Sequence, residues 1–391
     1  MDKKIKVRVV LLTEACPLAC RYCDLKNDAV YGHFPAMSKE ELFSLIDVFD
    51  KEDDQNTTIT RINFTGGEPF LYWQWIKEII EKYGHRFQYS FNTSGYLFTE
   101  EILEFLFHYQ VSFVLSVDGN EKLTNYLRPV HSNPYKTGYY KQLVKILPSL
   151  LYYFPTTPYR IIIHPRYVDL MYQMYCEADR LGFKYFTFVL DFESRPERII
   201  PKEKKLMYWE DKHTEILQQQ MDLIVQDIII GMQQNVAKPR LVEIDRVIAF
   251  LLNQQPYDTN NLPCQLFSKR TLTTVASPDD TESNCLSSFF PNLQAAQEAL
   301  EQAYQNQNHK CIYDSECEAF EYCALNCCPQ RGMGAHGNFF HFDPLECALN
   351  KVAYNSAFKL LTICADICPN NKLYTRYINT FDYPGKKEVV M

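Results

Sequence analysis

Apolar positions follow two patterns along the first half of the chain. Short runs rich in β-branched and aromatic residues predict strands, and apolar positions that recur every three or four residues predict helices. The predicted strands are 7–12, 59–65, 87–92, 111–117, 159–163 and 185–190. The predicted helices are 38–49, 73–83, 99–109, 139–151 and 168–181. Ser38 and Glu41 have the spacing of a capping box at the start of the first helix.

This order of elements predicts an α/β fold, a partial (β/α)6 barrel of the TIM-barrel type. Strand–helix–strand crossovers make the sheet parallel, and the chemistry of such barrels gathers at the carboxyl ends of the strands. Further along, a helical, Gln-rich segment carries Asp222 and Asp227, and after Pro256 the sequence becomes irregular and rich in Cys. We expect a barrel at 1–203, a helical bridge at 204–258, a small irregular Cys-rich domain at 259–370 and a tail at 371–391.

The charge balance limits the partners of the chain. Its 391 residues include 40 Lys and Arg against 48 Asp and Glu, a formal net charge of −8. This acidic balance argues against nucleic-acid binding. No apolar stretch is long enough to span a membrane, and the apolar run near Val9 is too short for a signal peptide. We therefore expect a cytoplasmic protein that has no contact with membranes.

Fourteen cysteines are the unusual part of the composition. In a reducing compartment, dense cysteine indicates metal or cluster ligation rather than disulfides. Cys176 stands alone in an apolar helical segment, where we expect a buried thiol. Nearly all of the others fall into two groups.

The first group is Cys16, Cys20 and Cys23, directly after the first predicted strand. Three thiolates in one loop can hold a 4Fe–4S cluster, which has four ligand positions, and leave one iron open to a small molecule. Zinc is the alternative, although zinc sites are usually built from paired C-x2–4-C knuckles with partners downstream.

The spacing Cys16-x3-Cys20-x2-Cys23, with Tyr22 before the last cysteine, resembles that of radical SAM enzymes. The resemblance implies a cluster whose open iron binds the amino and carboxylate groups of S-adenosylmethionine (SAM). Reductive cleavage then gives a 5′-deoxyadenosyl radical that abstracts hydrogen.

Three further strand ends resemble the SAM-contacting segments of that family. Two adjacent glycines allow a close backbone approach, and the Glu after them resembles the family's GGE motif for the methionine amino group. Short polar segments follow the third and fourth strands, and a later Arg would pair with the SAM carboxylate. The cofactor-binding residues so implied are Tyr22, Gly66, Gly67, Glu68, Asn92, Ser94, Ser116, Asp118 and Arg128.

The second group of cysteines resembles the SPASM extension of radical SAM enzymes, which carries two auxiliary 4Fe–4S clusters. The resemblance assigns one cluster to Cys311, Cys317, Cys323 and Cys347. It assigns the nearer one to Cys264, Cys285 and Cys327, with Cys328 or an open site as the fourth position.

The match to that extension departs from the family at two points. Cys311 lies six positions before Cys317 rather than three, and a Pro278–Asp280 turn replaces the hairpin glycine. A zinc ribbon is the alternative for this group. Cys364 and Cys368 lie beyond the pattern and are expected to be spare thiols.

SPASM-type enzymes act mostly on peptide or protein side chains. The expected function is therefore maturation of a ribosomally made peptide, with SAM and three 4Fe–4S clusters as cofactors. An anaerobic sulfatase-maturating enzyme, which forms formylglycine, is the second hypothesis, but Leu286 stands where that family usually has Asp. A non-catalytic cluster protein, acting as scaffold or electron carrier, is the third.

The expected partners are a peptide substrate with a leader and an external electron donor of flavodoxin or ferredoxin type. The first strand begins near Val7, which leaves no room for an N-terminal leader-binding domain. We therefore expect a separate recognition protein or direct binding of the leader. His164, Asp191 and Glu193, after the fifth and sixth strands, are candidates for general acid or base.

Overall fold

The structure is a computed structural model in which contacts divide the chain into two compact units. The first comprises Met1–Ile162, Glu177–Glu193 and Leu272–Ser283, and the second Ile163–Cys176, Ser194–Thr271 and Asn284–Met391. The residues described are 4–23, 36–53, 58–131, 138–190, 209–253, 271–277, 280–283, 295, 298–299, 302, 316–319, 322–323 and 344–367. The boundaries expected at 203, 258 and 370 fall outside these ranges, so they stay predictions.

The first unit is built on an open sheet. All six predicted strands are present: β1 (Lys4–Leu11), β2 (Thr58–Thr65), β3 (Gln88–Thr93), β4 (Ser112–Ser116), β5 (Tyr159–Ile163) and β6 (Tyr185–Leu190). They lie in the order β6-β5-β4-β3-β2-β1, and the pairs from β1 to β5 are parallel. Next to β1 lies an antiparallel hairpin of β8 (Thr271–Ser277) and β9 (Asp280–Ser283). The sheet is an unclosed, partial barrel, as predicted.

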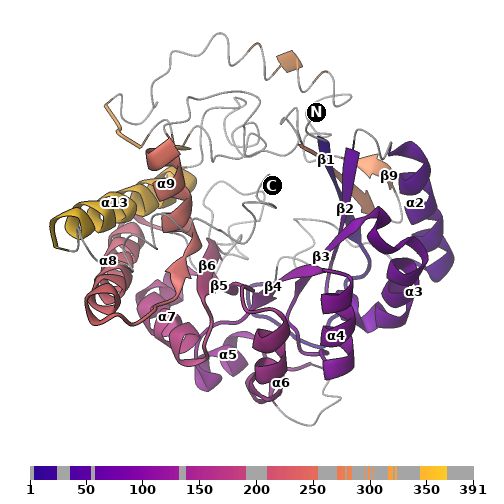
Figure 1. Ribbon diagram of the computed structural model, residues 1–391, viewed down its shortest axis with the longest axis horizontal. Helices are drawn as coiled ribbons and strands as arrows, with labels where there is room; N and C mark the ends of the chain where they lie inside the picture. The colour runs from indigo at the N-terminus through magenta and orange to yellow at the C-terminus, as the bar shows by residue number, and fades with distance from the viewer. Residues whose placement is uncertain are drawn as a thin grey trace. The chain divides into compact units, whose positions relative to one another are not determined.

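The predicted helices connect these strands. They are α2 (Lys39–Glu52), α3 (Trp73–Tyr83), α4 (Glu100–His108), α6 (Tyr139–Tyr153) and α7 (Met171–Arg180). In the capping box of α2, Ser38 Oγ accepts from Glu41 N, and the Glu41 carboxylate accepts from Ser38 N at 2.7 Å. A short helix that was not predicted, α5 (Glu121–Leu127), begins at Asn120, whose side chain accepts from Leu123 N. Figure 1 shows α2, α3, α4 and α6 on the outer side of the arc of strands.

The two faces of the sheet differ in chemistry. On the outer face Ile62, Phe64, Phe91, Leu115 and Ile161 are at most 1% exposed. The Phe64 and Phe91 rings stack with centroids 5.3 Å apart. The inner face carries the half-buried polar residues Asn63, Thr65, Ser90, Asn92, Ser116 and Arg160. Parallel strands are usually apolar on both faces, so this polar inner face indicates a ligand site.

The second unit contains three longer helices, α8 (Asp211–Gln234), α9 (Val242–Asn253) and α13 (Pro344–Ile367), and the short β7 (Arg240–Leu241). α13 packs on α8 and α9, and Figure 1 shows α8 and α13 side by side. Lys359 Nζ of α13 lies 2.9 Å from Asp222 Oδ2, and Gln218 of α8 donates to Ser356 Oγ at 3.1 Å. None of the helices in the described ranges is long and apolar enough to cross a membrane.

Two expectations from the sequence are wrong. Residues 344–367 were expected to be irregular, but they form α13, because Leu345, Val352, Leu360 and Cys364 recur with helical spacing and are buried. Cys176 was expected to be buried, but it is exposed. The buried stripe of α7 includes Met171, Met174, Tyr175 and Ala178, and Cys176 lies outside it.

Candidate functional site

The three cysteines of the first group lie in the loop that follows β1. Cys16, Cys20 and Cys23 are all partly exposed. The segment after α5 fastens the loop on its far side, because Ala19 N donates to Pro129 O at 2.7 Å and His131 N donates to Pro17 O at 2.7 Å. The loop backbone is therefore fixed from both sides, by β1 and by residues 127–131.

The thiols of this loop are close enough to influence one another. Burial, together with the charges of Glu68, Cys20 and Cys23, raises the pKa of Cys16 to about 12. A metal that binds Cys16 has to displace the thiol proton. No group of three or more His, Cys, Asp or Glu in the described part of the chain is arranged around one metal ion. In a cubane each cysteine binds a different iron atom, so its ligands need not converge on one point.

A group of three residues, of which Asp118 and Arg128 are buried, attaches the loop to the ends of β4 and β5. Arg128 Nε lies 2.7 Å from Asp118 Oδ2, which also accepts from the Tyr22 hydroxyl. The other oxygen, Asp118 Oδ1, accepts from Ile162 N at 3.1 Å. The Arg128 guanidinium lies over the Tyr22 ring at 5.3 Å and 3.8 Å from Cys20 Sγ. Asp118 and Arg128, both predicted to contact cofactor, are thus paired with each other in this structure.

The two glycines at the end of β2 pack against the cysteine loop. Gly67 N donates to Thr13 O at 2.6 Å, and Glu68 N donates to Ala15 O at 2.9 Å. A Cβ on Gly66 would overlap the Thr13 carbonyl, and one on Gly67 would overlap the Glu14 and Ala15 carbonyls. The sequence predicted a close approach of this backbone to a ligand. The close approach that the structure shows is to the cysteine loop.

The Glu68 carboxylate is a buried acceptor. It accepts from Ser94 Oγ at 2.7 Å, Ser94 N at 3.1 Å, Thr93 Oγ1 at 2.8 Å and Phe70 N at 3.3 Å. Burial raises the pKa of Glu68, and the hydrogen bonds from Ser94 and Thr93 offset part of that rise. These donors fill the lone pairs of a carboxylate, but hydroxyls can rotate. An ammonium ligand would therefore replace Ser94 or Thr93 as donor.

Polar residues of the inner face form a chain of contacts across three strands. Arg160 Nη2 donates to Asn92 Oδ1 at 3.3 Å, and Asn92 Nδ2 donates to Thr65 Oγ1 at 3.4 Å. Two buried atoms of this face, Asn63 Oδ1 and Arg160 Nε, have no hydrogen-bond partner. Burial, together with the charge of Arg128, lowers the pKa of Arg160 to about 10. Ser116, between these strands, has its backbone carbonyl bonded to the Tyr139 hydroxyl at 2.6 Å.

Sequence analysis missed Asn63 and Arg160, because neither lies in a motif at a strand end. The signal that would have found them is the alternation of strand residues. Asn63 and Thr65 on β2, and Arg160 between Tyr159 and Ile161 on β5, interrupt otherwise apolar runs at every second position.

The auxiliary ligand sets stay predictions. Cys323 and Cys347 are buried and Cys317 is partly exposed. The other expected ligands, Cys264, Cys285, Cys311 and Cys327, lie outside the described residues, as do Cys328 and Cys368. Cys364, one of the expected spare thiols, is buried 3.6 Å from the Met232 sulfur.

Among the acid–base candidates, the structure describes His164. Its Nδ1 accepts from Arg166 N at 3.0 Å and caps the 3-10 turn Pro165–Leu170. Burial, together with the charge of Arg166, lowers the pKa of His164 to about 4. The ring is therefore neutral at pH 7 and serves as a cap. Asp191 and Glu193 lie outside the described residues.

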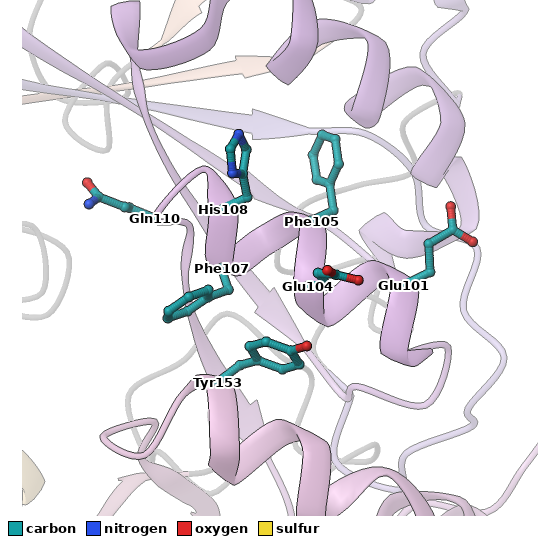
Figure 2. Close-up of a pocket in the computed structure, with 7 residues that line it drawn as sticks. All are labelled: Glu101, Glu104, Phe105, Phe107, His108, Gln110 and Tyr153. Carbon is teal, nitrogen blue, oxygen red and sulfur yellow. The ribbon is translucent and has the colours of Figure 1, made fainter.

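A pocket of about 710 Å³ lies on the outer side of the barrel. Figure 2 shows its lining, which comes from α4 and the residues around it together with Tyr153 of α6. Glu101, Glu104, His108 and Tyr153 are its charged or titratable residues. It shares no residue with the cysteine loop or the inner face.

Comparison with known proteins identifies the barrel. Residues 10–169 match the radical SAM superfamily. 7-carboxy-7-deazaguanine synthase of Methanocaldococcus jannaschii is 33% identical over 99 residues, 23% of this chain and 40% of that protein. Radical SAM cyclopropyl synthase TigE of Paramaledivibacter caminithermalis is 27% identical over 138 residues, 32% of this chain and 29% of that protein. The chain spans less than half the length of these curated relatives.

Two solved structures have the same fold. anSMEcpe with bound AdoMet and Cp18Cys peptide matches with a TM-score of 0.64 at 17% identity, over 93% of this chain and 99% of that one. SuiB of Streptococcus suis bound to its precursor peptide SuiA matches with a TM-score of 0.55 at 13% identity, over 89% of this chain and 76% of that one. These two structures show the fold, and the superfamily match shows that residues 10–169 form a radical SAM domain.

Proposed function

We propose that the chain is a radical SAM enzyme that modifies a residue of a ribosomally made peptide, installing a cross-link or a related change. The superfamily implies a 4Fe–4S cluster and SAM. The observation that carries the proposal is the cysteine loop, which is bonded on one side to the GGE segment and on the other to the Tyr22–Asp118–Arg128 group. These hydrogen bonds and this ion pair hold the thiols of the cysteine loop beside the half-buried polar inner face of the sheet.

The residues present fit the cofactor in charge and in hydrogen bonding. Cys16, Cys20 and Cys23 would hold three irons, and Glu68 would accept from the methionine ammonium. The unpaired polar atoms of Asn63 and Arg160 offer further contacts on the inner face. When bound and reduced by one electron, the cluster supplies cleavage of SAM to methionine and a 5′-deoxyadenosyl radical that takes hydrogen from the substrate.

The residues around the cysteines have a positioning role. Asp118 and Arg128 neutralise each other, so they fix the loop without adding net charge beside the cluster. Gly66 and Gly67 let the end of β2 lie directly against the loop. The Glu68 carboxylate is therefore held at a fixed position relative to the cysteines. Tyr22 links the last cysteine of the motif to Asp118.

The peptide substrate is supported by the neighbours in fold. The anSMEcpe and SuiB structures contain peptides, and both match most of this chain. We further propose two auxiliary clusters in the C-terminal cysteines, a leader recognised directly or by a separate protein, and a flavodoxin or ferredoxin donor. Formation of formylglycine is the second candidate, because the sulfatase maturase anSMEcpe matches this chain over 99% of its own length.

Iron content tests the cluster assignment. Three cubane clusters give ~12 Fe per chain after anaerobic reconstitution, falling to ~8 in the Cys16→Ala/Cys20→Ala/Cys23→Ala variant. A wild type with only ~4 Fe would remove the auxiliary clusters from the proposal. Cys176→Ala, which changes an exposed thiol outside both groups, is the matched control and should retain the wild-type iron content.

Activity tests the reaction. The dithionite-reduced wild type should convert SAM to 5′-deoxyadenosine, and the triple variant should not. Failure of the fully loaded wild type to cleave SAM would favour a non-catalytic cluster protein. An aldehyde in the product that reacts with hydrazide would favour formylglycine over a cross-link.

A further inference from the structure

Arg160 lies on the inner face of the sheet, on β5. The pairing register places Arg160 opposite Ser116 on β4, and Asn92 of β3 opposite Val114. Since Val114 and Ser116 are two residues apart on one strand, Asn92 and Arg160 share a face of the sheet. The hydrogen bond between them confirms that the Arg160 side chain extends across β4 toward β3.

The charge of Arg160 has no counterpart in the described part of the chain. Its one hydrogen-bond acceptor there is the neutral amide of Asn92, and its Nε is buried without a partner. Arg8 and Arg128, two buried arginines of the same unit, are neutralised: Arg8 pairs with Asp53 at 2.9 Å, and Arg128 pairs with Asp118 at 2.7 Å.

An unpaired buried charge is costly, and a charged ligand removes that cost. With a pKa lowered to about 10, Arg160 is still protonated at pH 7. Arg128, which the sequence assigned to a carboxylate, is already occupied by Asp118. Arg160 therefore remains available to an anion on this face.

We propose that Arg160, oriented by Asn92, binds a carboxylate group of a ligand on the inner face of the barrel. The inference rests on the proposed function, which supplies two sources of such a group. One is the methionine carboxylate of SAM, and the other is an acidic side chain of the peptide substrate. A planar guanidinium with a free Nε matches a carboxylate in geometry and charge.

The first arm of the test measures SAM binding. Calorimetry on the anaerobic, unreduced holoenzyme compares SAM with decarboxylated SAM, for wild type, Arg160→Met and Asn92→Asp. If the ligand is the methionine carboxylate, Arg160→Met loses about 10- to 100-fold in SAM affinity and no longer distinguishes the two compounds. Asn92→Asp, which places a carboxylate beside Nη2, should also weaken SAM binding.

The second arm uses the SAM-saturated holoenzyme and small probes of a peptide carboxylate. N-acetylaspartate amide should raise the melting temperature of the wild type but not of Arg160→Met, and N-acetylasparagine amide should raise neither. This result, with SAM affinity unchanged, would assign the subsite to the substrate. Equal behaviour of wild type and both variants in the two arms would overturn the proposal.

Stability gives a readout independent of binding. Arg61→Met is the matched control, because Arg61 lies on the same face but donates to Gln88 at 2.9 Å. Removing an unsatisfied charge should leave the ligand-free melting temperature of Arg160→Met at or above the wild-type value. A larger loss than in Arg61→Met would show a structural role and contradict the proposal. A wild type that binds SAM but does not cleave it would refute the proposed reaction while leaving this subsite in place.

Discussion

Gly67 and Thr13 are joined by a backbone hydrogen bond of 2.6 Å that continues the pairing of β1 and β2 past the last ladder position. This bond places the GGE segment against the cysteine loop, and it requires glycine because a Cβ would overlap the Ala15 carbonyl. The motif thus has a packing role toward the cysteines in addition to any contact with a ligand.

We expect Gly67→Ala to displace the cysteine loop. Overpacking of this kind costs about 1–3 kcal/mol, and the iron bound at the first cluster should fall, because the thiols no longer share their present arrangement. The measurement is iron per chain and 5′-deoxyadenosine yield. Gly84→Ala is the control, since Gly84, with a φ of 51°, has no atom within 4 Å of an added Cβ. Equal iron loss in both variants would contradict this packing role.

Asp118→Asn should destabilise the barrel strongly. The change leaves the buried Arg128 charge without its carboxylate, and breaking a buried pair in this way costs about 3–5 kcal/mol. Tyr22→Phe removes a single hydrogen bond to the same carboxylate and should cost about 1 kcal/mol. Urea unfolding of both variants gives the two values. Similar, small losses of unfolding free energy in the two variants would show that the Asp118 carboxylate does not hold this group together.

Asp53 should make the stability depend on acid pH. Burial opposes its charge, but hydrogen bonds from Arg8, Lys6 and Thr60 outweigh burial and lower its pKa. A carboxyl with a lowered folded-state pKa stabilises the fold above its unfolded value of about 3.9, and that contribution disappears as pH falls through the lower folded value.

The measurement is the difference in unfolding free energy between wild type and Asp53→Asn. It should be constant from pH 7 to about pH 5 and shrink below about pH 4. Glu41→Gln, at the exposed capping box, is the control for a carboxylate on the surface. If this difference in unfolding free energy instead increases as the pH falls, Asp53 is protonated in the folded protein.

Cys176 and Cys364 should differ in reactivity. Cys176 is exposed, whereas Cys364 is buried beside the Met232 sulfur. Brief alkylation with iodoacetamide, followed by peptide mapping, should label Cys176 and leave Cys364 unmodified until urea is added. Labelling of Cys364 in the folded protein would contradict its packing against Met232.

The strands and helices were predictable because the spacing of apolar residues that predicts each of them lies within its own segment of the chain. β5 and β6 have the predicted bounds, and α3 spans the predicted residues. The errors have physical causes. The cysteine-rich composition of residues 344–367 predicted irregular structure, although the apolar residues there have helical spacing. The apolar composition around Cys176 predicted burial, although Cys176 lies outside the buried stripe of α7.

The candidate site was predicted in part. The loop, GGE and strand-end residues were found as motifs, and the structure brings Tyr22, Asp118 and Arg128 together. That Arg128 is paired with Asp118 rather than free could not be predicted, since the pairing depends on how α5 returns the chain to the cysteine loop. Arg160 lies in no motif, and its unpaired state is visible only in three dimensions.

The hairpin beside β1 has a consequence for how the barrel is made. Without β8, β1 would present an open hydrogen-bonding edge. β8 begins at Thr271, so at typical translation rates β1 waits on the order of 10 to 50 s for its neighbour. A chain that stops after β6 would keep this edge exposed and pair with other copies. The smallest piece that folds cleanly therefore extends at least to Ser283.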